Sequence, residues 1–486
     1  MGRSFGANEA TELGPYQKSR VKCAGRVADK LAAPKERAPC ACVTVPPRGS
    51  GGNYAAPAGR PTARQTWRHS MRKAIVLALV LAVLGLGAIG AAAQDKVIRF
   101  AHPGDFTKVY TFATEEWVQG EVDYLTLVNL KGGVGGYKFA ALVTDTGNEP
   151  QRGIEAYERF KREGAIVFNF QSTPVSRAIV PRVLQDKIVL LMPFHGRSDA
   201  ADGTTFPYLF SMGANYWSQA TVITKYILDH EGGNLKGKKL ALVHIDSPFG
   251  HEPKPVFEEL SRRLGFEVSF FPYASPGTEQ SGTWTQVRRF HPDWIALWGA
   301  GPSQSVSIKE AIRSGFRNDH LISVLWLAEK DMQIVGPQQG KGILRFEAAV
   351  PGRDHPLVKE ILSEVYQKAN KGYGKSENVG STYYSVGINT VAPMVEGVRI
   401  AQARFGDPVT AEKLKQALET LTNFNAHGFM APITITPTDH EGGGLGRISQ
   451  WDGTNWVPQT DWYSAWREIV WDMVKKSSEE FKKSGR

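Results

Sequence analysis

Three short stretches contain polar side chains of the kind that hold small charged molecules. The first reads QSTPVS, where Ser172 or Thr173 is placed to cap a helix whose first turn contains Pro174. The first N–H groups of such a helix have no partners within the helix, and its positive end attracts anions. The stretch therefore predicts a carboxylate site, with a plain helix cap that touches no ligand as the alternative.

The second stretch, GRSD, follows an apolar run that predicts a strand. Its Arg197, between Gly196 and Ser198, could clamp a carboxylate with two parallel hydrogen bonds or point to solvent. His195 before it is interpreted as a loop residue and not as a base. The third stretch, SVLWLAEKDM, places Glu329 after another predicted strand, and a lone glutamate in a loop is usually solvated.

Aromatic residues near these stretches are candidate walls for an apolar part of a ligand. Tyr216 lies in MGANYWSQ, and Trp298 comes directly before GAGPSQ. Because aromatic side chains lie more often in the core than in a pocket, only Tyr216 is predicted to contact a ligand.

Motifs of the common enzyme classes are missing from the sequence. GGVGGY around Gly133 precedes a strand instead of joining a strand to a helix, and GAGPSQ from Gly299 lacks the third glycine of a dinucleotide site. The chain has no P-loop, no H-E-x-x-H and no G-x-S-x-G, and its eleven histidines show no ligand spacing. The sequence therefore predicts no catalytic residue, no metal site and no cofactor.

Strands that alternate with helices must position these residues. The apolar runs predict strands at Val97–Ala101, Tyr137–Thr144, Ala165–Phe170, Ile188–Met192, Leu240–Ile245, Phe266–Phe271, Trp294–Trp298 and Ile322–Leu327. Most are followed by a mixed stretch of helix length, which predicts an α/β fold of parallel sheets covered by helices. KFAALVTD at 138–145 and KLALVHID at 239–246 match with an offset of 101 residues, and this repeat predicts two similar lobes.

The ordered set of motifs resembles a known family, the periplasmic substrate-binding proteins of branched-chain amino acid ABC transporters. The stretches VNLKGGVGGYKFAALVTDTGNEPQRGIEAYERF, FQSTPVSRAIVPRVLQDKIVLLMPF and KKLALVHIDSPFGHEPKPVFEELSRRLGFEV carry the resemblance. It implies the type I periplasmic binding fold, with two doubly wound parallel-sheet lobes joined by a three-stranded hinge. The implied first lobe is 94–214 plus 351–430, the second is 215–350 plus 431–459, and an amphipathic helix at 460–486 ends the chain.

The resemblance also implies roles for the polar residues. Gly196, Arg197 and Ser198 fall on the family's Gly-Ala-Thr segment, which holds the α-amino and α-carboxylate groups of the ligand; Ser198 fits this pattern and Arg197 departs from it. Glu329 falls where the family has a carboxylate that pairs with the ligand ammonium.

The implied function is that of a solute-binding protein. It would deliver a small polar ligand, an amino acid or a related amide or carboxylate, to an ABC transporter permease by hinge closure, as a monomer and without chemistry. A ligand sensor of the same fold is the first alternative, and an α/β enzyme is the second.

Composition separates the first seventy residues from the rest. Residues 1–70 contain 12 basic and 4 acidic side chains and all three cysteines, whereas residues 94–486 contain 44 basic and 44 acidic ones. The overall charge of +10 therefore does not indicate a nucleic acid partner. The Ala-, Arg-, Pro- and Gly-rich residues 1–70 are predicted to be disordered.

The stretch MRKAIVLALVLAVLGLGAIGAAAQDKV has the order of a secretory signal. A basic start, an apolar run and the small residues 91–93 predict a signal peptide at 71–93 that is cleaved before Gln94, and therefore a periplasmic protein. The apolar run is shorter than the roughly 20 residues of a membrane anchor, the alternative interpretation. Translation is accordingly expected to start at Met71, and a disordered cytoplasmic extension is the alternative for residues 1–70.

Overall fold

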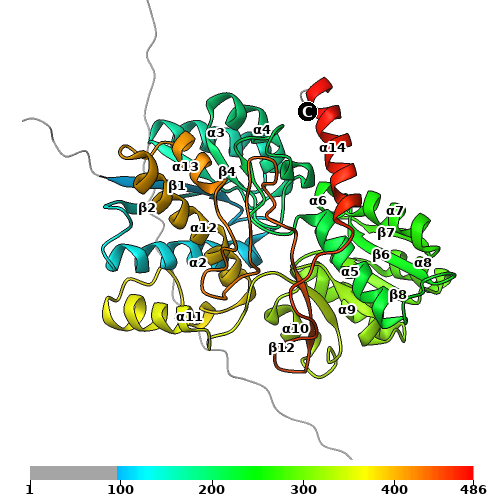
Figure 1. The fold of residues 1–486 in the computed structure, drawn as a ribbon. Coiled ribbons are helices and arrows are strands. Elements are labelled where there is room, and N and C mark those ends of the chain that lie inside the picture. The colour runs from blue at the N-terminus through cyan, green and yellow to red at the C-terminus, as the bar shows by residue number, and fades with distance from the viewer. Residues whose placement is uncertain (1–95, 485–486) are drawn as a thin grey trace, which may run out of the picture. The chain divides into compact units, whose positions relative to one another are not determined.

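The computed structural model describes residues 96–484 of the chain (Figure 1). The predicted extension at 1–70 and the predicted signal peptide at 71–93 lie outside the described residues. Within the described part, no helix combines the length and the apolar character that a membrane span requires.

The first lobe, lobe 1, is built on a five-stranded parallel sheet in the order β2-β1-β3-β4-β5. Its strands are β1 (Val97–Gly104), β2 (Lys138–Asp145), β3 (Ala165–Phe168), β4 (Val189–Leu191) and β5 (Leu209–Phe210). Its helices are α2 (Thr111–Leu130), α3 (Pro150–Arg162), α4 (Thr173–Asp186), η1 (Ser198–Ala201), α11 (Pro356–Ile361), the π-helix η3 (Leu362–Lys368), η4 (Ser376–Asn378), α12 (Thr382–Phe405) and α13 (Ala411–Leu418). Apolar residues of α2, α12 and α13 pack in one cluster of the lobe, and those of α3 and α4 pack in another, so helices cover the sheet on both faces.

The second lobe, lobe 2, is built on a seven-stranded sheet in the order β12-β11-β10-β9-β8-β6-β7. Its strands are β6 (Lys239–Ile245), β7 (Glu267–Tyr273), β8 (Trp294–Trp298), β9 (Leu321–Ser323), β10 (Leu344–Glu347), β11 (Arg447–Trp451) and β12 (Trp456–Pro458). Its helices are α5 (Tyr216–His230), α6 (Pro248–His251), α7 (Lys254–Leu264), α8 (Ser281–Phe290), α9 (Pro302–Arg313), η2 (Asn318–His320) and α10 (Glu329–Val335). Strand β11 pairs antiparallel with both β10 and the edge strand β12, and the other pairings are parallel.

Buried apolar strands explain why the two sheets form. All five residues of β8, the sequence WIALW, are buried, as expected for a parallel strand covered by helices on both faces. On the amphipathic helix α7, Val256, Phe257 and Leu260 are buried, and their spacing places them on one face.

The two lobes are similar, but the predicted repeat pairs the wrong strands. In lobe 2, β6 lies between β7 and β8, just as β1 lies between β2 and β3 in lobe 1. The structural counterpart of β6 is therefore β1 and not β2, and the match at an offset of 101 residues is shifted by one strand. Both matched segments end in aspartate and lead to a helix through a loop with proline, a pattern that successive β-α units share.

The fold class predicted from the sequence is confirmed. The chain passes from lobe 1 to lobe 2 after β5, returns after β10 and leaves lobe 1 again after α13. These three connections lie side by side, because the N–H of Ser211 donates to the carbonyl of His440 (3.1 Å) and the N–H of Val350 donates to that of Phe429 (3.3 Å). The lobe boundaries inferred at 214, 350 and 430 remain predictions.

The last helix, α14 (Arg467–Ser484), contacts both lobes. Ile469, Val470 and Val474 on α14 are buried in the core cluster of lobe 2. Further along, the hydroxyl of Ser477 donates to the Asp199 carboxylate of lobe 1 at 2.6 Å.

A buried arginine on β10 joins the lobes beside these connections. Arg345 is fully buried, and its guanidinium donates to the carbonyl of Leu327 (2.7 Å), the hydroxyl of Thr382 on α12 (2.8 Å) and the carboxylate of Glu347 (3.1 Å). Arg345 of lobe 2 is thus hydrogen-bonded to the first turn of α12 in lobe 1.

We expect Arg345→Met to lower the free energy of unfolding by about 3 kcal/mol, the lower end of the cost of breaking a buried ion pair. The cost stays at this lower end because Arg447 still pairs with Glu347. Urea unfolding followed by circular dichroism measures the change. Arg262→Met, which removes an exposed ion pair, should leave the midpoint unchanged; equal midpoints for both variants would contradict the role of Arg345.

Candidate functional site

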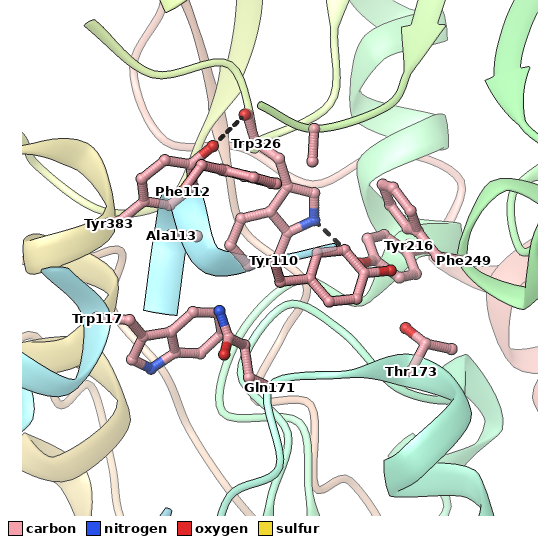
Figure 2. A pocket seen from close by; sticks show the side chains of 11 residues that line it. Tyr110, Phe112, Ala113, Trp117, Gln171, Thr173, Tyr216, Phe249, Trp326 and Tyr383 are labelled. Carbon is pink, nitrogen blue, oxygen red and sulfur yellow. Dashed lines mark hydrogen bonds between the residues drawn. The ribbon is translucent and has the colours of Figure 1, made fainter. Parts of the chain in front are cut away.

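A cavity between the lobes is lined mainly by aromatic side chains, as Figure 2 shows. The lining residues are Tyr110, Phe112, Ala113, Trp117, Gln171, Thr173, Tyr216, Phe249, Ala300, Trp326 and Tyr383. None of these described residues has a charged side chain. The free space is about 30 Å³, room for a water molecule or two, so an organic ligand can enter only when side chains or lobes move apart.

The lining residues come from loops and helix starts that follow the parallel strands. Tyr110 and Phe112 follow β1, Gln171 and Thr173 follow β3, and Trp326 follows β9. In parallel α/β sheets these strand ends are where ligands bind, and here the strand ends of the two lobes face one cavity.

A buried carboxylate helps to fix the loop that follows β1. Asp105 is buried and accepts hydrogen bonds from the backbone N–H groups of Thr107, Lys108, Val109 and Tyr110, at 2.8 to 3.3 Å. The loop is thereby held in the conformation that presents the Tyr110 ring to the cavity. Burial raises the pKa of Tyr110, so its hydroxyl stays protonated at neutral pH.

The start of α4 supplies the polar part of the lining. Ser172 caps this helix, because its hydroxyl accepts a hydrogen bond from the N–H of Val175 (3.4 Å). Thr173 in the first turn and Gln171 just before it line the cavity. The N-terminal end of α4, which favours negative charge, therefore lies at the cavity wall.

Trp326 forms the central wall on the side of lobe 2. Its indole stacks on Trp117 of lobe 1, with ring centroids 5.5 Å apart, and donates to the hydroxyl of Tyr216 (3.0 Å). Its carbonyl accepts a hydrogen bond from the hydroxyl of Tyr383 on α12 (2.8 Å; Figure 2). Side chains of both lobes therefore meet at one indole.

A second cavity of about 200 Å³ adjoins the first and shares Tyr110, Phe112, Phe249 and Ala300 with it. Of the described residues that line the two cavities, only Lys108 is charged, and it lies in the second cavity. Lys108 forms an ion pair with Glu149 and is half-exposed. The adjoining cavity is thus larger than the first, and it is the one with a charged side chain in its lining.

The structure brings Thr173 and Tyr216 to the cavity, and Ser172 and Gly196 lie directly behind them. The N–H of Gly196, a residue with φ of +86°, donates to the hydroxyl of Thr173 at 3.4 Å. Ser198 lies further away, where its hydroxyl donates to the Glu252 carboxylate of lobe 2 at 3.0 Å. It serves a contact between the lobes and is not part of the cavity lining.

Arg197 is turned away from the cavity, and its side chain is only 12% exposed. Its guanidinium binds Asp199 through two hydrogen bonds of 2.6 Å and lies 4.7 Å from the ring centroids of Phe206 and of Phe481 on α14. Neither the clamp nor the solvent-exposed alternative describes this position. Arg197 thus contacts the C-terminal helix α14 through the ring of Phe481.

Glu329 also lies outside the cavity lining. Its carboxylate accepts hydrogen bonds from the N–H (3.0 Å) and the hydroxyl (2.7 Å) of Thr382, the first residue of α12, and lies 3.8 Å from the guanidinium of Arg345. A carboxylate at a helix N-terminus is stabilised by the helix dipole. The carboxylate that the family resemblance pairs with a ligand ammonium is thus engaged in a contact between the lobes.

Two histidines lie behind Trp117, each within about 6 Å of its ring centroid. His195 is buried, and burial lowers its pKa to about 4, so the ring is neutral at physiological pH. The imidazole of His102 pairs with the buried carboxylate of Glu121 (2.6 Å). Neither histidine lines the cavity.

Sequence reasoning missed most of the lining, namely Tyr110, Phe112, Trp117, Gln171, Phe249, Trp326 and Tyr383. The signal that could have found several of them is their position directly after predicted strands. Ligands of parallel α/β sheets bind beyond the carboxyl ends of the strands. If every loop that follows a predicted strand had been considered, the loops that contain Tyr110 and Trp326 would have been selected.

Comparisons with known proteins agree with the fold. A family model described as a periplasmic binding protein matches residues 97–455 of the chain. A solved structure described as an ABC transporter permease from the Pseudomonas fluorescens group is 33% identical, with a TM-score of 0.74, over 81% of this chain and 98% of its own. No curated protein matches the chain.

Two more distant structures share the fold. A branched-chain amino acid ABC transporter protein from Thermus thermophilus, solved with bound valine, is 21% identical with a TM-score of 0.68, over 78% of this chain and 99% of its own. A solute-binding protein from R. palustris in complex with benzoate is 16% identical with a TM-score of 0.62, over 75% of this chain and 95% of its own.

A buried carboxyl group holds the turn that leads from Trp326 into α10. Asp331 is 1% exposed and accepts a hydrogen bond from the N–H of Ala328 at 2.9 Å. Burial raises the pKa of its carboxyl group from 3.8 to about 7. Between these pH values the folded state binds more protons than the unfolded state, so this group makes the protein less stable as the pH rises.

We expect Asp331→Asn to remove this pH dependence. The free energy of unfolding of the variant minus that of the native chain should rise by roughly 2.5 kcal/mol between pH 5 and pH 8. About two pH units separate pH 5 from the pKa of the folded state, and each unit corresponds to about 1.4 kcal/mol. Urea unfolding at several pH values measures the difference. A difference that stays constant over this range would contradict the raised pKa.

Proposed function

The chain belongs to the family of periplasmic binding proteins, and we propose that it captures a small aromatic carboxylate in the periplasm and delivers it to an ABC transporter permease. The observation that carries the proposal is the cavity between the lobes, which has seven aromatic side chains and no charged one in its lining. The protein releases its ligand chemically unchanged.

An α-amino acid fits this lining less well than a carboxylate without an ammonium group. An ammonium group in a closed cleft needs a carboxylate or several acceptors, because burying an unpaired charge is costly. The Glu329 carboxylate is engaged with Thr382 and Arg345. An amino acid ligand would have to draw Glu329 away from these partners.

A single carboxylate has suitable partners at the start of α4. The hydroxyl of Thr173 and the side-chain amide of Gln171 line the cavity at the positive end of that helix. The cation of Lys108 in the adjoining cavity would attract an anion. The aromatic ring of the ligand would then lie against Trp326, Tyr216 and Phe249.

The closed arrangement that would hold the ligand is stabilised by direct contacts between the lobes. Besides the stack of Trp326 on Trp117, Lys330 of lobe 2 pairs with Glu116 of lobe 1 at 2.8 Å. A ligand that touches both lobes stabilises the closed arrangement, because only there does it make all its contacts. Opening must come first, since the closed cavity has room for little more than water.

The fold is compatible with ligands of several classes. The structural neighbours include proteins described with bound valine and with benzoate, and one described as a fatty acid transporter component from Thermomonospora curvata. At 16 to 21% identity these neighbours support the fold alone, so the choice among ligand classes rests on the lining.

We expect 3-phenylpropanoate to bind at least about 30-fold more tightly than phenylalanine, which differs from it only by the ammonium group. An unpaired buried ammonium should cost about 2 kcal/mol or more. Titration calorimetry with benzoate, 3-phenylpropanoate, phenylalanine and leucine measures the order of affinity. If phenylalanine or leucine binds most tightly, the amino acid hypothesis replaces ours. Recovery of a chemically altered ligand would indicate an enzyme.

We also expect Trp326→Ala to weaken binding of the best aromatic carboxylate at least about 30-fold, because it removes the central wall. The matched control is Trp462→Ala, which removes an indole that does not line either cavity. Glu329→Gln should change the affinity less than about threefold. A large loss with Glu329→Gln and none with Trp326→Ala would show that the ligand is held by charge and not by the aromatic wall.

A further inference from the structure

Two histidines and a glutamate that are distant from the cavity come together on lobe 2. His230 is the last residue of α5, Glu231 follows it, and His320 ends η2 ninety residues later. One potential ligand atom of each lies within 4.8 Å of the other two. No metal-ligand spacing is visible in the sequence, because His320 is distant along the chain and reaches the other two residues only in the folded structure.

The orientation of these side chains suits metal ligation. Nδ1 of His320 lies 2.8 Å from the carbonyl oxygen of Asp293, to which it can donate, so Nε2 keeps its lone pair. Histidines that bind metals typically fix their second nitrogen in this way. The indole of Trp294 stacks on His320 with centroids 4.3 Å apart and donates to the Glu231 carboxylate at 2.9 Å.

We propose that His230, Glu231 and His320 form a binding site for one divalent transition-metal ion of the zinc class. Two imidazoles and a carboxylate are a ligand set that zinc accepts, with water completing the coordination. Metal–ligand bonds of about 2.0–2.2 Å require the ligand atoms to approach further. His230 is exposed and can rotate to close the site, whereas His320 is held by its stack.

The surrounding charges allow a cation to bind here. The C-terminal end of α5, where His230 and Glu231 lie, is the negative end of the helix dipole. Lys238 pairs with one oxygen of Glu231 (2.7 Å). The other oxygen lies 4.0 Å from Nδ1 of His230. Lys238 is 38% exposed, so it can move outward when a metal ion binds.

Zinc titration of the full chain tests the site. The protein carries no affinity tag, and its three cysteines are alkylated so that they cannot bind zinc. We expect one zinc ion per chain with micromolar or tighter affinity by calorimetry. Glu231→Gln and His230→Ala should each weaken binding at least about tenfold, since even the loss of an outer-shell partner typically costs 10- to 100-fold.

The control is His251→Ala, which removes another exposed histidine of lobe 2, one that pairs with a single carboxylate, Asp246. It should leave zinc affinity unchanged. Melting curves in EDTA verify that each variant is folded, and Glu231→Gln can keep the hydrogen bond from Trp294. No zinc binding in the micromolar range, or equal affinity in the native chain and in both site variants, would overturn the proposal.

Discussion

The indole of Trp326 is the contact on which the closed cleft depends. It stacks on Trp117 of lobe 1, donates to Tyr216 of its own lobe, and lies next to a carbonyl that Tyr383 of lobe 1 binds. Large aromatic surfaces contribute much of the apolar stabilisation at an interface. The charged contacts around it, such as that of Glu329 with Thr382, close the lobes at their rim and leave the interior apolar.

The family and the two-lobed α/β fold were predictable because buried parallel strands leave long apolar runs in the sequence. WIALW predicts β8 to the residue. The segment predicted as a strand at Ile322–Leu327 leaves the sheet at Ser323. Its remaining residues are still buried, and Trp326 among them stacks on Trp117 of the other lobe. The strands β5, β10, β11 and β12 were not predicted. The last two follow a glycine-rich stretch, and the charged and polar residues of β10 (LRFE) and β11 (RISQW) interrupt the apolar run that marks the predicted strands.

The site was predictable only in part, for a physical reason. The cap at Ser172 and the cavity residue Thr173 follow from local sequence, since helix capping is a local interaction. The contact of Arg197 with the C-terminal helix could not be predicted from sequence, because Phe481 lies almost three hundred residues away. Aromatic residues of the core and of a cavity look alike in a sequence, and only the packing of the lobes separates Trp326 from Trp298.

The most direct test of the aromatic cleft is a crystal structure of the protein with the aromatic carboxylate that binds it most tightly. The account predicts the ligand ring against Trp326 and Tyr216, the carboxylate beside Thr173, and Glu329 still bound to Thr382. A ligand outside this cavity, or Glu329 turned from Thr382 towards the ligand, would contradict the account.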